Sequence, residues 1–202
     1  MLESLNTIDW SSLTHAHGSA TDVPELLRSL LSQDADVRLR ACTELHEKIW
    51  HQGTVYSASA AVVPLLYDLL TDPDLHDQGC VVSLLGCIAT GEGWIQNGIR
   101  VAGEHTLRRR LARQGRSLEE ALEEERAAME AMHRAVSAGL RHLLPYLTDR
   151  EGLAALVAQV LGNFPEHRSW LVPAIDAALA SESDEYVRQV LAESKARLTD
   201  AG

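Results

Sequence analysis

The chain has 202 residues and a formal net charge of −11. A surface of this sign repels phosphate backbones, so we expect no nucleic-acid partner. Apolar residues make up 46% of the chain and aromatic residues only 4%. Ala and Leu dominate, which favours helices over strands.

The sequence contains no segment typical of export or of a membrane span. Residues 1–4 lack a basic start followed by an apolar run, which argues against a signal peptide. No stretch approaches the ~18 consecutive apolar residues of a transmembrane helix, so we expect no membrane partner. The three cysteines are odd in number and form no C-x-x-C, which argues against a disulfide framework or a zinc site. We therefore expect a cytoplasmic protein with no cofactor and no bound metal.

A repeat of about 40 residues organises the chain. The segment 23–30 resembles the segment 63–70, each with Pro at its second position, and the same offset places Trp10 on Trp50. Two weaker copies follow, at 144–147 and 172–175.

Each of these Pro-containing helices is followed by an acidic turn and a second apolar helix. Asp34 and Asp72 mark the first two turns and stand 38 residues apart, as do Cys42 and Cys80. The two cysteines therefore occupy one repeat position, which we place on the inward face of the second helix. This repeated pattern predicts a helical solenoid.

The predicted elements are all helices, and no segment shows the alternation of a strand. Asp22 with Glu25, and Ser117 with Glu120, have the spacing of capping boxes. The predicted helices span 22–31, 36–50, 57–71, 74–89, 101–115, 117–146, 150–162, 167–180 and 184–198.

The segment 91–140 interrupts the repeat. A loop with Gly91 and Gly93 either closes over a pocket or ends a helix and turns. A basic run, 108–116, then precedes an acidic run, 119–125. The arginines could bind phosphate or an acidic partner, although Arg beside a Glu-rich helix more often neutralises itself through ion pairs.

Three motifs carry a family resemblance. They are the Pro-x-Leu-Leu first helix, the Asp-x-x-Val-Arg turn, and the run Trp-His-Gln-Gly-Thr-Val-Tyr at 50–56. They resemble the HEAT-repeat family, and more narrowly small bacterial HEAT-repeat proteins. The resemblance implies a short right-handed α-solenoid of helix pairs, with an extended helical pair in the middle and a concave face that binds a partner. It also implies a ladder between repeats, for which the matching residues are Asp34, Arg38, Asp184 and Arg188.

We expect a single HEAT-repeat domain over residues 1–202. Its parts are an N-terminal turn (1–20), two repeats (21–90), an extended irregular repeat (91–147) and C-terminal repeats (148–202).

The candidate site lies at three inter-helix junctions, 11–20, 51–56 and 91–94. Junctions of successive repeats line up along one edge of a solenoid, so we expect these three to be neighbours. They hold a large share of the His and Trp residues. The candidate binding residues are His15, His17, Trp50, His51, Gln52, Tyr56, Glu92 and Trp94.

A packing role competes with binding at these positions. Trp50 and Tyr56 could wedge between repeats, and the recurrence of Trp10 at the equivalent position favours packing. His51 could cap a helix end, but the equivalent residue is Ser11 and not His, which favours function.

A metal site is the other alternative at the first junction. His15 and His17 could supply two ligands, and His51 could join them in space. No third ligand of convincing spacing follows from the sequence, so we favour a solvated turn.

Two functions fit this pattern. The first is a protein- or peptide-binding scaffold that uses its concave face. The alternative is a small-molecule enzyme of lyase or cyclase type, with His51, Glu92 or His15 as acid–base groups. No catalytic residue is assigned, because the sequence contains no recognisable catalytic motif. A deep cleft with converging polar groups would favour the enzyme, and a broad groove would favour the scaffold.

Overall fold

The computed structural model describes residues 2–148 and 152–200, and the described chain is predominantly helical. This confirms the all-α class predicted from composition. The α-helices are α1 (Val23–Ser29), α2 (Ala35–Ile49), α3 (Ser57–Leu70), α4 (Gln78–Thr90), α5 (Trp94–Ala102), α6 (Glu104–Ala112), α7 (Leu118–Gly139), α8 (Leu153–Leu161), α9 (Arg168–Ser181) and α10 (Glu185–Asp200). Short 3-10 segments are η1 (Leu2–Thr7), η2 (Trp10–Ser12), η3 (Leu140–Thr148) and η4 (Pro165–His167).

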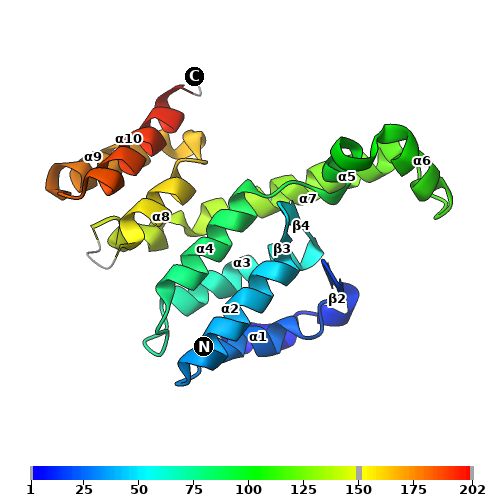
Figure 1. The fold of residues 1–202 in the computed structure, drawn as a ribbon, viewed down its shortest axis with the longest axis horizontal. Helices are drawn as coiled ribbons and strands as arrows, with labels where there is room; N and C mark the ends of the chain where they lie inside the picture. Colours follow the sequence, from blue (N-terminus) through cyan, green and yellow to red (C-terminus); the bar gives the residue numbers. More distant parts are fainter. Residues whose placement is uncertain (1, 149–151, 201–202) are drawn as a thin grey trace.

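Neighbouring helices pack in pairs: α1 on α2, α3 on α4, α5 on α6, and α9 on α10. The long α7 runs back along α3 and α4, and α8 packs against both α4 and α10. Figure 1 shows α5 and α6 at one end of the molecule and α9 and α10 at the other. The helices α5, α6 and the start of α7 therefore form an arm beside the body.

The helix boundaries differ from prediction where Gly or Pro interrupts the backbone. A single helix was predicted over 101–115, but Gly103, with φ 81°, separates α5 from α6. The helix predicted over 117–146 ends at Gly139 and continues as η3, which contains Pro145. Proline lacks the N–H that an α-helix needs, which explains the change.

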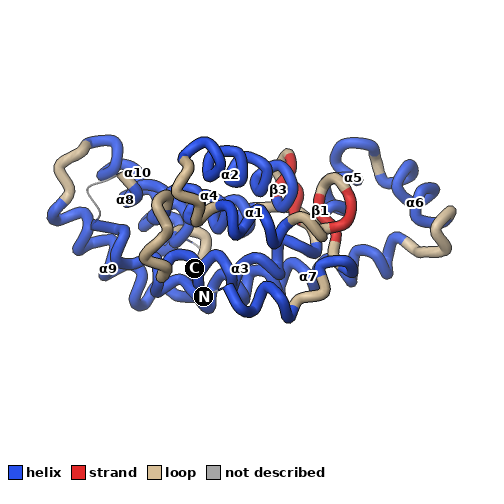
Figure 2. The backbone as a smooth tube through the Cα atoms, turned by 90° about the horizontal axis from the view of Figure 1, so that it is seen from below, coloured by secondary structure: helices blue, strands red, loops and turns tan. Residues whose placement is uncertain are grey.

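The structure contains two short hairpins, whose strands the sequence pattern did not predict. In the first, β1 (Thr14–His15) pairs with β2 (Gly18–Ser19), and in the second, β3 (Trp50–His51) pairs with β4 (Thr54–Val55). Gln52 and Gly53, with φ 50° and 87°, form the turn of the second hairpin. Two-residue strands are too short for alternation to be visible. Figure 2 shows both hairpins between α2 and α5.

The turn residues Asp and Arg act within their own helix pairs. Asp34 and Asp184 each cap a helix by accepting a hydrogen bond from the backbone N–H three residues later. Arg38 donates to the carbonyls of Ser32 and Gln33 in the turn after α1, and Arg188 donates to the carbonyls of Leu179 in α9 and of Glu182 just after it, with Nη1–O distances of 2.7 to 3.0 Å. The ladder expected between repeats is therefore wrong at these residues, because each guanidinium group binds carbonyls of the turn or helix end within its own helix pair.

The buried side chains form two cores. The main core unites residues from α1 to α4 with residues from α7 to α10. A second, smaller core holds the arm together and consists of Ile95, Leu107, Leu111, Leu118 and Ala121. Among the described residues, no helix combines the length and apolar character needed to cross a membrane.

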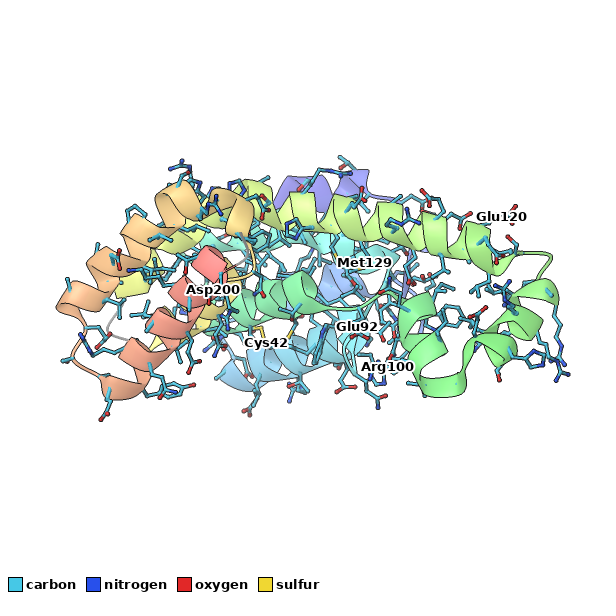
Figure 3. The ribbon with its side chains drawn as sticks, turned by 90° about the horizontal axis from the view of Figure 1, so that it is seen from above. Cys42, Glu92, Arg100, Glu120, Met129 and Asp200 are labelled. Carbon is cyan, nitrogen blue, oxygen red and sulfur yellow. A yellow bond between two sulfur atoms is a disulfide. The ribbon has the colours of Figure 1, made fainter. Side chains whose placement is uncertain are left out.

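A disulfide joins Cys42 of α2 to Cys80 of α4, with a Cα–Cα distance of 6.0 Å. The expectation of no disulfide is therefore wrong. The shared repeat position of these cysteines was the signal for the bond, because α2 and α4 are neighbouring second helices. Cys87 has a free, half-buried thiol, and burial raises its pKa. Figure 3 shows the disulfide in yellow beside the label of Cys42.

We predict that the oxidised protein, denatured without reductant, contains one titratable thiol, from Cys87, among its three cysteines. Reduction should lower the free energy of unfolding by about 3 to 4 kcal/mol, because the bond closes a loop of 38 residues in the unfolded chain. Thiol titration and urea denaturation measure the two effects. Cys87→Ser, which leaves the bond intact, is the control, and three titratable thiols before reduction would contradict the prediction.

The contact between α3 and α7 depends on a glycine. Tyr67 of α3 is 7% exposed, and its hydroxyl donates to the carbonyl of Val136 at 2.7 Å. A Cβ at Gly139 would lie 2.2 Å from the Tyr67 ring. Gly139 therefore allows the ring to lie flat against the α7 backbone. Burial raises the pKa of Tyr67, so its hydroxyl remains a donor at neutral pH.

We predict that Gly139→Ala destabilises the protein by about 1 to 3 kcal/mol, because the added methyl displaces the Tyr67 ring from a packed interface. Thermal and urea denaturation measure the change. The neighbouring exposed substitution Ala138→Ser should stay within about ±0.5 kcal/mol of the wild type. Equal stability of the Gly139→Ala variant and the wild type would refute this account of the interface.

Candidate functional site

Backbone hydrogen bonds bring the three predicted junctions together. The first hairpin is attached to α2, because the N–H of Ala16 donates to the carbonyl of Lys48 at 2.9 Å. The second hairpin pairs with the third junction: the N–H of Val55 donates to the carbonyl of Glu92 at 3.0 Å, and the N–H of Glu92 donates to Gly53 at 2.7 Å. The predicted adjacency of these segments is therefore present in the structure.

His15 is a buried structural residue of the first hairpin. Its Nε2 lies 3.0 Å from Asp22 Oδ1, and its Nδ1 accepts a hydrogen bond from the backbone N–H of His17. Lys48 pairs with both Asp22 and Glu44. Partial burial opposes ionisation of Asp22, but the hydrogen bonds from Lys48 and His15 outweigh it and lower the pKa of its carboxyl. Both nitrogens of His15 are engaged, so it is not placed to bind a ligand atom.

His17 and His51 meet beside the end of α2. Their ring centroids lie 5.3 Å apart, and His51 Nδ1 lies 3.1 Å from Glu47 Oε2. His17 is exposed and His51 is half-buried. Glu47 was not among the predicted site residues. Its position four residues before His51, on the last turn of a helix, was the available signal.

Trp50 fits the packing alternative better than a binding role. Trp50 packs on the main core, and its Nε1 is buried without a hydrogen-bond partner among the described residues. Its counterpart Trp10 is buried, and its Nε1 donates to Leu5 at 2.9 Å. Gln52 is exposed at the hairpin turn.

Glu92 lies two residues before the start of α5, and Trp94 is the first residue of that helix. The carboxylate of Glu92 pairs with Arg100 at 3.1 Å, and the Arg110 guanidinium lies 4.9 Å from the ring centroid of Trp94. Glu125 of α7 accepts hydrogen bonds from two backbone N–H groups of the first turn of α5. A Cβ on Gly93 would lie 2.0 Å from the Glu125 carboxyl carbon, so Gly93 makes room for this cap.

A groove of about 720 Å³ lies between the two hairpins, the arm and α7; we call it the α7 groove. Of the predicted residues, His15, Tyr56 and Trp94 line it, and burial raises the pKa of Tyr56. Three of the eight predicted residues therefore line this groove, two form the His17–His51 contact, and Trp50, Gln52 and Glu92 belong to neither. Sequence reasoning missed the α7 side of the groove, which includes Ala128, Met129 and Met132. Figure 3 labels Met129 on α7, on the side that faces the hairpins and α5.

The basic run divides into paired and unpaired arginines. Arg108 pairs with Glu104 and Glu119, and Arg116 pairs with Glu124, as the self-neutralising alternative predicted. The other three arginines of the run, two on α6 and one at its C-cap, have no carboxylate within ion-pair distance among the described residues. These three, the α6 arginines, are Arg109, Arg110 and Arg113, and Arg110 also lines the α7 groove.

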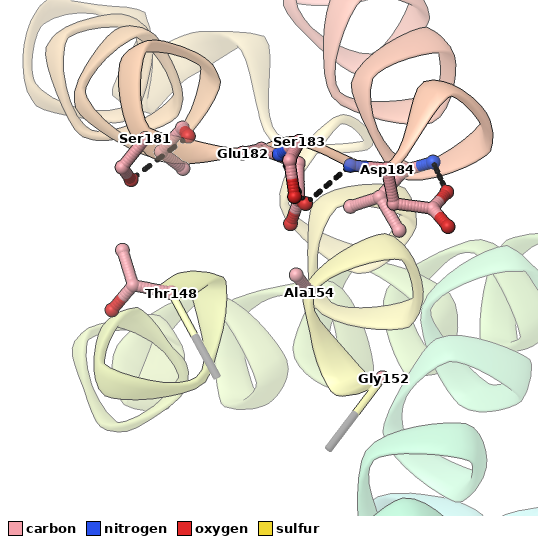
Figure 4. Close-up of a pocket in the computed structure, with 9 residues that line it drawn as sticks. Thr148, Gly152, Ala154, Ser181, Glu182, Ser183 and Asp184 are labelled. Atoms are coloured by element: carbon pink, nitrogen blue, oxygen red, sulfur yellow. Dashed lines mark hydrogen bonds between the residues drawn. The ribbon is translucent and has the colours of Figure 1, made fainter. Parts of the chain in front are cut away.

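A second pocket, of about 760 Å³, lies between α8 and the turn from α9 to α10. Figure 4 shows Glu182 and Asp184 on its upper side and Thr148 and Gly152 on the lower side. Two of its lining residues, Thr148 and Gly152, are the ends of the two described segments, and we assign the pocket no role.

Comparison of the chain with protein-family models, with curated proteins and with solved structures finds no match. The site is therefore interpreted from its own geometry.

We predict that Glu125→Ala loosens the arm, because it removes the cap and the favourable charge from the N-terminus of α5. Stability should fall by about 1 to 2 kcal/mol. Hydrogen exchange of residues 94–112 should accelerate, while exchange in α3 and α4 stays unchanged. Glu123→Ala, on an exposed residue of the same helix, is the control. Equal protection of the arm in the Glu125→Ala and Glu123→Ala variants would contradict the prediction.

Proposed function

We propose that this chain is a HEAT-type helical-repeat protein, of the small bacterial kind, that binds a protein or peptide partner. The paired packing of its helices supports a short solenoid with an extended middle pair. So do the bonds shared by the two Asp–Arg sets, one near each end of the chain: Asp34 and Asp184 cap a helix, and Arg38 and Arg188 each donate to the carbonyl six residues earlier. The equivalent positions of the bonded cysteines support it as well.

The observation that carries the binding proposal is the α7 groove beside the unpaired α6 arginines. The groove is open to solvent, and its surface is more apolar than polar, with Tyr56, Trp94 and Met129 among its large side chains. Aromatic residues and Met are the side chains that protein interfaces favour. A chain segment with apolar residues would bury them against this surface.

The α6 arginines indicate which charged side chains the partner carries. They form a local basic surface on a protein whose formal net charge is −11. Arg pairs with carboxylates in a fixed fork geometry, so this surface suits Asp or Glu on a bound segment. We therefore propose an apolar segment flanked by acidic residues as the occupant of the groove.

The enzymatic alternative has less support. Of its three candidate acid–base groups, only His15 lines the α7 groove, and both of its nitrogens are engaged. Glu92 pairs with Arg100, and His51 lies outside the groove lining. The polar groups do not converge on one point of a deep cleft, as small-molecule catalysis requires.

The cytoplasmic location remains a prediction from the sequence. Disulfides persist in oxidising compartments and are rare in reducing ones, so the Cys42–Cys80 bond bears directly on it. The thiol state of the protein taken from its native cells would decide the matter.

We predict that selection from a random peptide library on the purified protein enriches segments that combine apolar residues with Asp or Glu. Ala128→Glu, on an exposed residue of the groove, should weaken binding of an enriched peptide at least tenfold. Arg110→Glu with Arg113→Glu should do the same, because the charge of the basic surface is reversed. Calorimetric titration of each variant measures the affinities.

Matched controls separate the groove from the rest of the surface. Ala127→Glu adds the same charge to the neighbouring exposed residue of α7, outside the groove lining, and should keep wild-type affinity. Equal weakening by both Ala→Glu substitutions, or no enrichment, would overturn the proposal. Random-sequence duplex DNA is titrated as a second probe. Submicromolar, steeply salt-dependent binding that the Arg variants lose would show a nucleic-acid site instead.

A further inference from the structure

Three side chains from two adjacent junctions converge outside the α7 groove. His17 comes from the tip of the first hairpin, Glu47 from the last turn of α2, and His51 from β3. Each offers one ligand atom, and these three atoms all lie within 4.8 Å of one another. The closest contact joins His51 Nδ1 to Glu47 Oε2 at 3.1 Å.

This set of atoms has the chemistry of a zinc site. Two imidazole nitrogens and one carboxylate oxygen hold Zn²⁺ in many proteins, and bonds of about 2.0 to 2.2 Å place tetrahedral ligand atoms roughly 3.4 Å apart. The three ligand atoms, all within 4.8 Å of one another, lie close to that spacing. Imidazole ligands favour Zn²⁺ and its neighbours in the transition series over Ca²⁺ and Mg²⁺.

The surroundings hold these ligands in place. The Ala16–Lys48 hydrogen bond fixes the first hairpin on α2, and buried His15 accepts the backbone N–H of His17. Such outer contacts orient ligands before a metal binds. Among the described residues, Glu47 pairs with no Lys or Arg, so no cation competes for its carboxylate.

In the described chain, a second group of metal-binding side chains does not compete with His17, Glu47 and His51 for the ion. Cys42, His46 and Cys80 also lie close together, but the two sulfurs are bonded to each other. A thiolate, not a disulfide sulfur, is the metal ligand. Within the described residues, the oxidised protein therefore has one candidate set.

We propose that His17, Glu47 and His51 bind one Zn²⁺-class ion, which fastens the first hairpin to the second. Three protein ligands leave the fourth position for water or for a carboxylate of a bound partner. The site differs from the metal alternative weighed against a solvated turn in the sequence, in which His51 joined His15 and His17: His15 has both nitrogens engaged, and Glu47 supplies the third ligand.

Zinc titration of the oxidised, metal-free protein by calorimetry tests the site, with no peptide present, so its outcome is independent of the proposed function. We expect one ion per chain. His17→Ala, His51→Ala and Glu47→Gln should each weaken binding at least tenfold. Each variant is checked by circular dichroism, and the wild type and the His51→Ala variant are titrated with Co²⁺ as well. The wild type should gain the visible absorption of tetrahedral cobalt, and the His51→Ala variant should not.

The matched control is His76→Ala, which removes an exposed histidine outside the cluster and should bind zinc like the wild type. Three results would overturn the proposal: no 1:1 site in the wild type, retention of affinity in the three ligand variants, or loss of affinity in His76→Ala alone. Zinc binding that appears only after reduction of the disulfide would assign the ion to Cys42, His46 and Cys80 and would also overturn it.

Discussion

The backbone hydrogen bonds that attach the inter-helix junctions to one another and to α2 are the constraint on which the surface of this protein depends. A loop that joins two helices has unpaired N–H and C=O groups, and burying them without partners is costly. Here the second hairpin pairs with Glu92 on one side, and the first hairpin reaches Lys48 on α2. These bonds place successive junctions side by side, which creates both the α7 groove and the His17–Glu47–His51 cluster.

The arm is the part of the molecule with the least packing support. Its core has five fully buried members, whereas the main core extends over most of the other helices. Glu125 compensates at one point by capping α5 from α7. Regions with few buried contacts open at lower free energy than a main core. One wall of the α7 groove therefore belongs to the part of the fold that can adjust to a partner.

Helix α2 is linked to its neighbours on both sides. On one side the Ala16–Lys48 hydrogen bond holds the first hairpin, and on the other the Cys42–Cys80 disulfide holds α4. The proposed zinc ion would add a third link at the end of the same helix. The first two links hold α2 to the hairpin that precedes its own helix pair and to the next pair.

The sequence by itself determined the helical class, most helix positions, the equivalence of Cys42 with Cys80, and the adjacency of the junctions. All of these follow from spacing along the chain, which local periodicity and repeats record. The tertiary structure alone decided that the cysteines bond, that Glu125 caps α5, and that Glu47 and not His15 faces His17 and His51. These facts depend on side-chain directions between elements, and a pattern of residue types along one chain does not encode such directions.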